Sequence, residues 1–153
     1  MNGETDLTRN STQPAKTSVF ISCGCAKCNP AAMEKRDKEA FFSRLGIREQ
    51  DCILYTIEDG GINDLATNGV ARRVRKMLAA DPNLRALTVY VSTDCERDQQ
   101  RFKPDEIRRK QETDMWMGFS NLREEMNILG RQVGISLFHH DRSLGPYPRQ
   151  LRV

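Results

Sequence analysis

The chain has 153 residues, of which 38% are hydrophobic, and a formal net charge of +3. This length suits one domain with a single core, and no apolar run approaches the roughly 20 residues that span a bilayer. We therefore expect no membrane segment, and the modest positive charge does not indicate a nucleic-acid partner.

The first residues of the chain, 1–16, include acidic side chains and lack the apolar core of a secretory signal. We interpret them as a disordered leader and expect a cytoplasmic protein, in which disulfides are disfavoured. The five cysteines are an odd number and only three of them cluster, so we do not expect a disulfide scaffold.

Residues 17–22, TSVFIS, form a short β-branched run that predicts a buried strand. A helix should follow, because Asn29 is a good N-cap residue and Pro30 suits the first helical position. Apolar residues then recur at about 3.6-residue intervals, and Gly46 predicts the end of this helix. Residues 52–57, CILYTI, predict a second strand.

A second helix is expected over 64–80, and the run ALTVYVS predicts a third strand over 86–92. After Pro104, apolar residues at spacings of three and four predict a long amphipathic helix. A fourth strand is expected over 135–140, and we interpret residues 142–153 as an irregular basic tail.

The order β-α-β-α-β-α-β with apolar strands predicts a parallel sheet covered by helices on both faces. Right-handed crossovers make this an α/β fold with a small doubly wound, flavodoxin-like sheet, which we expect to form a single domain over residues 17–141. Ligands of such sheets bind beyond the carboxyl ends of the strands. Cysteines, histidines and acids gather at those ends: Cys23, Cys25, Cys28, Glu58, Asp59, Asp94, Cys95, His139, His140 and Asp141.

The thiols permit three interpretations, which the sequence leaves open. Cys25 and Cys28 have the C-x2-C spacing of a zinc site, and Cys23, Cys95, His139 or His140 could complete a tetrahedral set of ligands. The same C-x2-C pair follows a strand and precedes a helix, which is the placement of a thioredoxin-type redox dithiol. Alternatively, the thiols only pack around a tight turn. Neighbouring residues of a strand point to opposite faces, so His139 and the histidine after it cannot both face one site.

Several segments resemble Toll/interleukin-receptor (TIR) domains, a family with a flavodoxin-like fold. VFIS at 19–22 is similar to the opening strand of that family, and FFSRLGI at 41–47 to the end of its first helix. VYVS at 89–92 resembles its third strand, and SNLREEMNILGRQVGISLF at 120–138 its later helix and fourth strand.

The resemblance implies a nucleotide-binding or NAD-cleaving domain. Enzymatic members of the family use a glutamate on the helix before the fourth strand, and the matching positions are Glu124 and Glu125. A carboxylate there could stabilise the positive charge that develops on the ribose when its bond to nicotinamide breaks. The residues expected to line the pocket under this hypothesis are Ser22, Asp59, Gly60 and Ser92.

Two other interpretations remain. Acidic pairs on helices are most often a solvated face, and the domain could be a non-enzymatic module that only binds a protein partner. A nucleic-acid interface ranks lower, because no aromatic residues interleave with the arginine clusters. We therefore expect a nucleotide-type small molecule or a protein as the partner, with zinc as the candidate cofactor.

Overall fold

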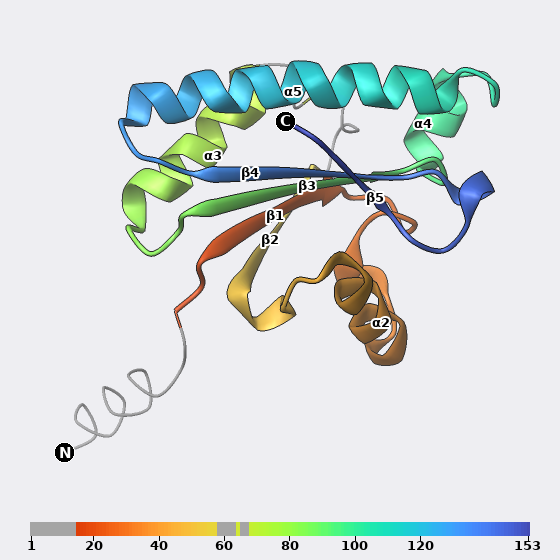
Figure 1. Cartoon of the computed structure of the whole chain (residues 1–153), viewed down its shortest axis with the longest axis horizontal. Coiled ribbons are helices and arrows are strands. Elements are labelled where there is room, and N and C mark those ends of the chain that lie inside the picture. The colour runs from red at the N-terminus through yellow and green to blue at the C-terminus, as the bar shows by residue number, and fades with distance from the viewer. Residues whose placement is uncertain (1–14, 58–63, 65–67) are drawn as a thin grey trace.

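The computed structural model describes residues 15–57, 64 and 68–153, and within them the chain forms a five-stranded sheet (Figure 1). The strands are β1 (Ser18–Cys23), β2 (Cys52–Ile57), β3 (Ala86–Ser92), β4 (Gly134–His140) and β5 (Arg149–Leu151). Their spatial order is β2-β1-β3-β4-β5; the first four are parallel, and β5 runs antiparallel to β4. The predicted flavodoxin-like α/β sheet is therefore confirmed.

Helices cover both faces of this sheet. Figure 1 shows α3 and α5 along one face, with α4 at the end of that layer, and α2 on the opposite face. The helices are α2 (Lys35–Leu45), α3 (Asn68–Ala80), α4 (Glu96–Arg101) and α5 (Ile107–Leu129), and the 3-10 turns are η1 (Pro30–Ala32), η2 (Glu49–Asp51) and η4 (Arg142–Leu144).

Alternation along the strands divides the core into two hydrophobic clusters, because successive side chains of a strand point to opposite faces. Val19 and Ile21 face the cluster under α3 and α5, where they pack with Val74 and Leu122. Phe20 points the other way, into the cluster that α2 covers. The central strands are buried on both faces, which is why the sequence shows continuous apolar runs there.

The first helix starts later than the sequence predicts. The Asn29 Oδ1 accepts a hydrogen bond from the Ala31 amide at 3.0 Å, so the expected cap is present. It caps only the 3-10 turn η1, because Met33 has an extended backbone and interrupts the helix before α2 begins. Gly46 ends α2 in the left-handed conformation, as expected.

Two elements were not expected from the sequence. The polar loop after β3 contains α4, and the tail expected to be irregular contributes β5 to the sheet. Leu151 of β5 lies opposite Leu137 of β4 and packs against the larger cluster. This cross-strand apolar contact accounts for a strand in a segment whose local composition does not predict one.

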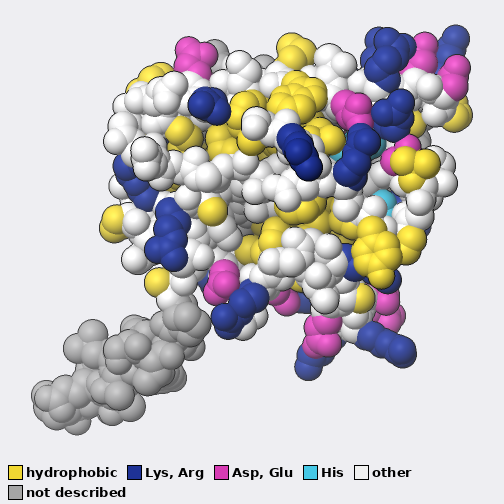
Figure 2. Space-filling model, in the orientation of Figure 1, with side chains coloured by type: hydrophobic (Ala, Val, Ile, Leu, Met, Phe, Trp, Pro, Cys, Tyr) yellow, Lys and Arg dark blue, Asp and Glu magenta, His cyan; other side chains and the backbone are white. Residues whose placement is uncertain are grey.

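Charges of both signs lie side by side on the face shown in Figure 2, around hydrophobic side chains exposed below the uppermost helix. Among the described residues, several charged side chains form ion pairs, such as Lys38 and Glu49, whose Nζ and Oε2 atoms lie 2.9 Å apart. Within the described residues, no helix combines the length and the apolar character that crossing a membrane requires.

Candidate metal centre

Adjacent parallel strands bring two cysteine-bearing loops together at the carboxyl edge of the sheet. β1 ends at Cys23 and is followed by the turn that carries Cys25 and Cys28. β3, the neighbour of β1, is followed by Cys95, which is the N-cap residue of α4. Cys25 and Cys95 are seventy positions apart in sequence. They lie close together because β1 and β3 are neighbours in the sheet.

The four thiols form one compact group. The Sγ atoms of Cys23, Cys25 and Cys95 all lie within 4.8 Å of one another, and the Cys25 and Cys95 Sγ atoms are 4.0 Å apart. Cys28 is buried in the same cluster as the other three. We call Cys23, Cys25, Cys28 and Cys95 the thiol group.

The fifth cysteine lies elsewhere. Cys52 begins β2, so it sits at the amino edge of the sheet. Its Sγ lies 3.3 Å from the Ser18 Oγ and 3.5 Å from the Arg48 carbonyl oxygen. Cys52 is therefore a buried packing residue and a natural control for the other four.

Burial differs among the members of the thiol group. The side chains of Cys23, Cys28 and Cys95 are 0% exposed, whereas Cys25 is only partly buried. Among the described residues, the other members of the thiol group are therefore shielded from water, and Cys25 is the one that water reaches.

Hydrogen bonds favour negative charge on two of the sulfurs. The Cys28 thiol, followed by that of Cys95, lowers the pKa of Cys23 to about 4. The Cys28 thiol also lowers the pKa of Cys25 to about 6, aided by the backbone amides of Glu96 and Lys27. Cys28 has a raised pKa, because its proton is shared with the other sulfurs. Amide donors aimed at sulfur stabilise a thiolate over a thiol.

The turn itself holds the sulfurs in place. The Cys25 carbonyl oxygen accepts hydrogen bonds from the amides of Cys28 and Asn29 at 3.1 and 3.0 Å. The Cys25 amide donates to the Cys23 Sγ at 3.4 Å. The backbone of this turn is therefore folded around the sulfurs.

The dimensions of the thiol group fit one metal ion. A zinc–sulfur bond of about 2.3 Å and tetrahedral geometry place neighbouring sulfurs about 3.8 Å apart. The Cys25–Cys95 separation of 4.0 Å is close to this value. Four cysteines around one position would fill a tetrahedral coordination sphere without a ligand from solvent.

His139, a predicted ligand, is not brought into the thiol group. Gln111 Nε2 donates to the Ser92 carbonyl oxygen at 2.8 Å and to Asp98 Oδ2 at 2.9 Å. The Gln111 Oε1 is therefore an acceptor, so the His139 Nε2 donates to it, at 3.0 Å. Burial lowers the pKa of His139 to about 4, which keeps the ring neutral.

Asp98 is a buried residue of this edge that the sequence did not indicate. Its carboxylate is 0% exposed and contacts Gln111 and Arg101. Burial raises its pKa. The only sequence signal was its place among the polar residues after β3, which is common in loops.

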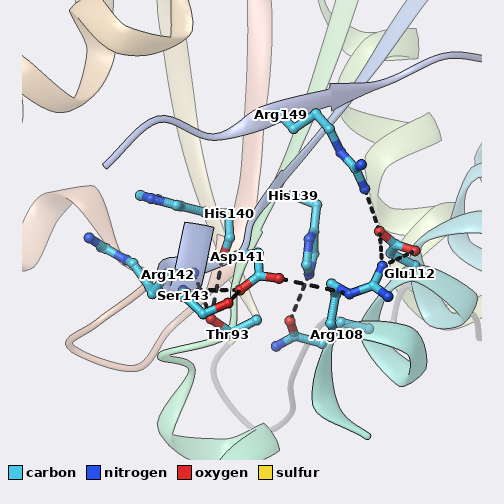
Figure 3. Close-up of polar contacts among 10 residues, drawn as sticks. Thr93, Arg108, Glu112, His139, His140, Asp141, Arg142, Ser143 and Arg149 are labelled. Atoms are coloured by element: carbon cyan, nitrogen blue, oxygen red, sulfur yellow. Dashed lines mark hydrogen bonds and ion pairs between the residues drawn. The ribbon is translucent and has the colours of Figure 1, made fainter. Parts of the chain in front are cut away.

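The end of β4 carries a charged network rather than a second thiol site (Figure 3). The Asp141 carboxylate accepts from the Ser143 hydroxyl and lies 3.8 Å from the Arg108 Nε. Glu112 joins Arg108 to Arg149 of β5. A cavity of about 660 Å³ opens beside this network, and none of the thiols is among the described residues that line it.

The residues expected to line a nucleotide pocket are only partly described. The Ser22 Oγ is buried with no hydrogen-bond partner among the described residues. The Ser92 Oγ accepts from the Asp94 amide at 3.1 Å and from the Arg142 Nε at 3.3 Å. Asp59 and Gly60 lie outside the described residues.

The two glutamates are far from this edge. Glu125 is buried and pairs at 3.0 Å with Arg75, joining α5 to α3, and Glu124 is exposed. Glu125 follows Gln111 by fourteen residues on α5, which is about 21 Å along a helix. Because Gln111 contacts Ser92, the structure does not bring these glutamates together with the serines.

Comparisons with known proteins identify no family for the chain. Neither protein-family models nor curated proteins match it. Among solved structures it is similar to the β-carbonic anhydrase of the fungal pathogen Aspergillus fumigatus, at 14% identity and a TM-score of 0.47. That match covers 98% of this chain and 82% of the other.

The resemblance to TIR domains is wrong. No protein-family model matches the chain, that of the TIR domains included. The short segments that carried the resemblance are ordinary for strands and helices of a flavodoxin-like sheet. The NAD and nucleotide predictions, and the roles assigned to Glu124 and Glu125, lose their basis with it.

Proposed function

We propose that this protein binds one zinc ion through Cys23, Cys25, Cys28 and Cys95. The observation that carries the proposal is the convergence of the Cys23, Cys25 and Cys95 sulfurs within 4.8 Å of one another, with Cys28 buried in the same cluster. The Cys25–Cys95 separation of 4.0 Å is close to that of a tetrahedral zinc–thiolate site. A thiol group that only packs has no need of backbone amides aimed at its sulfurs.

Zinc is the metal that the donor set favours. Thiolates are soft ligands, and a tetrahedral set of four selects zinc or iron among the common metals. A site closed by four cysteines leaves no position for water, so the bound ion has a structural role. It would join the turn after β1 to the start of α4.

The proposal is tested by metal analysis of purified protein, with four single Cys→Ser variants of the thiol group. We expect about one zinc per chain in the wild type and loss of that zinc in the Cys23, Cys25 and Cys95 variants. Affinity measured by competition with a chromogenic chelator should fall by at least about tenfold, since even groups that only support a ligand cost that much.

Two comparisons sharpen the result. Cys52→Ala removes a buried thiol outside the group and should leave the zinc content unchanged. Cys28→Ser distinguishes four ligands from three: loss of zinc shows that Cys28 is a ligand, and retention shows a three-thiolate site. One iron per chain, or no metal in reduced wild-type protein loaded with zinc, would contradict the proposal.

A further inference from the structure

Cys25 is the member of the thiol group that solvent reaches. The other three side chains are fully buried, and Cys25 is partly exposed, in the part of the chain that the structure describes. A small oxidant in water would therefore meet the Cys25 sulfur first. This inference rests on the proposed zinc site, in which the sulfurs are thiolates.

A second sulfur lies beside it. The Cys25 Sγ points to the Cys95 Sγ at a distance of 4.0 Å. The two residues belong to different segments, the turn after β1 and the N-cap of α4. Redox-sensing cysteines are typically solvent-accessible and lie beside a second, resolving thiol that forms the disulfide. The Cys25–Cys95 pair has both features.

We propose that Cys25 is a site of reversible oxidation by peroxides, that Cys95 resolves it, and that formation of the Cys25–Cys95 disulfide releases the zinc. The chain would then sense oxidant through the same residues that hold its metal. Cys23 and Cys28 would remain as two thiols, too few to retain the ion in a tetrahedral site.

The chemistry balances in two steps. The Cys25 thiolate attacks one oxygen of hydrogen peroxide; the O–O bond breaks, a sulfenic acid forms, and the departing hydroxide takes a proton to become water. The Cys95 thiolate then attacks the Cys25 sulfur; the S–S bond forms, the S–O bond breaks, and a second hydroxide takes a proton. Two thiolates, one peroxide and two protons thus give one disulfide and two waters.

The disulfide would replace the metal as the connection between two segments of the chain. Zinc joins the turn after β1 to the start of α4, and the Cys25–Cys95 bond joins the same two segments. Because it closes a long loop, it restricts the unfolded chain. We therefore expect the oxidised, zinc-free protein to melt at a higher temperature than the reduced, zinc-free protein.

The experiment starts from the full chain loaded with zinc and measured for zinc content. One equivalent of hydrogen peroxide is added, zinc release is followed with a chromogenic chelator, and disulfides are mapped by mass spectrometry without reduction. We expect about one zinc released per Cys25–Cys95 bond formed, and reloading after treatment with dithiothreitol. Cys52→Ala, the control, should behave as the wild type does.

A second arm detects the intermediate. In Cys95→Ser the Cys25 sulfenic acid has lost its resolving thiol, so dimedone should label Cys25 in this variant at least severalfold more than in the wild type. The mapping in the wild type does not depend on whether this variant holds zinc.

The outcomes separate the two proposals. If the wild type never loads zinc, the proposed function fails before peroxide is added. If zinc loads and peroxide neither releases it nor links Cys25 to Cys95, the zinc site stands and the redox inference is overturned. A Cys25–Cys28 bond, or a sulfinic acid on Cys25 with Cys95 still free, also overturns it.

Discussion

His139 is buried in the core with a neutral ring, because it donates a hydrogen bond within the fold and its surroundings exclude water. Its Nε2 donates to Gln111, and burial lowers its pKa to about 4. His140 points to the opposite face, where its Nε2 donates to the Gly145 carbonyl oxygen at 3.0 Å. Its Nδ1 then accepts from the Tyr90 hydroxyl at 3.1 Å. Each imidazole therefore donates its N–H to an acceptor within the fold.

The buried His139 predicts that stability falls in acid. Its pKa is about 4 when folded and about 6.5 when unfolded, so between these values the unfolded chain binds more protons. Its contribution is fully present above pH 6.5 and is lost as the pH falls through 4. We expect His139 to account for about 2 kcal/mol of the loss in unfolding free energy between pH 7 and 5.

Urea unfolding of the wild type and His139→Gln at several pH values measures this contribution. Glutamine can still donate to Gln111 but does not titrate. The thiols and Asp98, whose pKa is raised, contribute to the pH dependence of both proteins. The difference between the two proteins in the slope of unfolding free energy against pH therefore isolates the contribution of His139. Equal slopes would show that the ring is accessible to protons in the folded state.

Two of the helices, α2 and α5, are terminated by glycines whose backbone conformation is left-handed. Gly46 has φ 70° at the end of α2, and Gly130 has φ 77° at the end of α5. At Gly46 the following Ile47 amide donates to the Phe42 carbonyl oxygen, which satisfies the last turn. An added Cβ at either glycine meets no atom within 4 Å, so the cost of substitution lies in the backbone.

Replacing these glycines by alanine should therefore destabilise the protein through backbone strain. We expect Gly46→Ala and Gly130→Ala each to lower the free energy of unfolding by about 1 kcal/mol. Gly134→Ala, at the start of β4, is the matched control: the site has equal space without a positive φ, and we expect no loss. Equal effects at all three positions in denaturant titrations would contradict this explanation.

Local sequence predicted Gly46 as a helix end, but not the start of α2. A C′ glycine acts within one turn, so its signal is local. Asn29 and Pro30 also form their expected cap, yet the extended Met33 limits it to a 3-10 turn. That interruption lets Met33 pack against the cluster under α2, a tertiary contact that no local propensity describes.

At the scale of the whole molecule, the thiol group brings together the turn after β1 and the start of α4, two segments that no strand pairing connects. The two hydrophobic clusters lie along the strands, and the thiol group lies at the carboxyl end of β1 and in the segments after β1 and β3. The two clusters therefore contain no member of the thiol group. Metal binding should add stability to a fold that is already formed, rather than create the fold.

Removal of zinc should lower the melting temperature while leaving secondary structure in place. A ligand at 100 times its dissociation constant adds about 2.7 kcal/mol, which corresponds to about 5–10 °C for a chain of this size. Calorimetry with and without chelator measures the shift, and far-ultraviolet circular dichroism monitors the sheet and helices. Hydrogen exchange should rise in the turn after β1 and at the start of α4.

Two results would count against this view of the metal. An unchanged melting temperature after chelation would show that metal binding at the thiol group does not stabilise the fold. Collapse of the circular dichroism signal would show that the core does not form without the metal.

The sequence by itself determined the four parallel strands, the α/β class and the edge at which Cys23, Cys25 and Cys28 lie. These follow from hydrophobic runs and from the rule that loops after parallel strands share one edge. The thiol spacing permitted zinc, redox and packing alike, because nearness in sequence does not say which sulfurs converge.

Only the tertiary structure decided the composition of the candidate site. Cys95 joins the other three thiols because β3 lies beside β1, an order set by crossovers rather than by local pattern. The same packing turns His139 toward Gln111 and pairs Glu125 with Arg75. Contacts between segments far apart in the chain depend on how whole elements pack, and that information is absent from any short stretch of sequence.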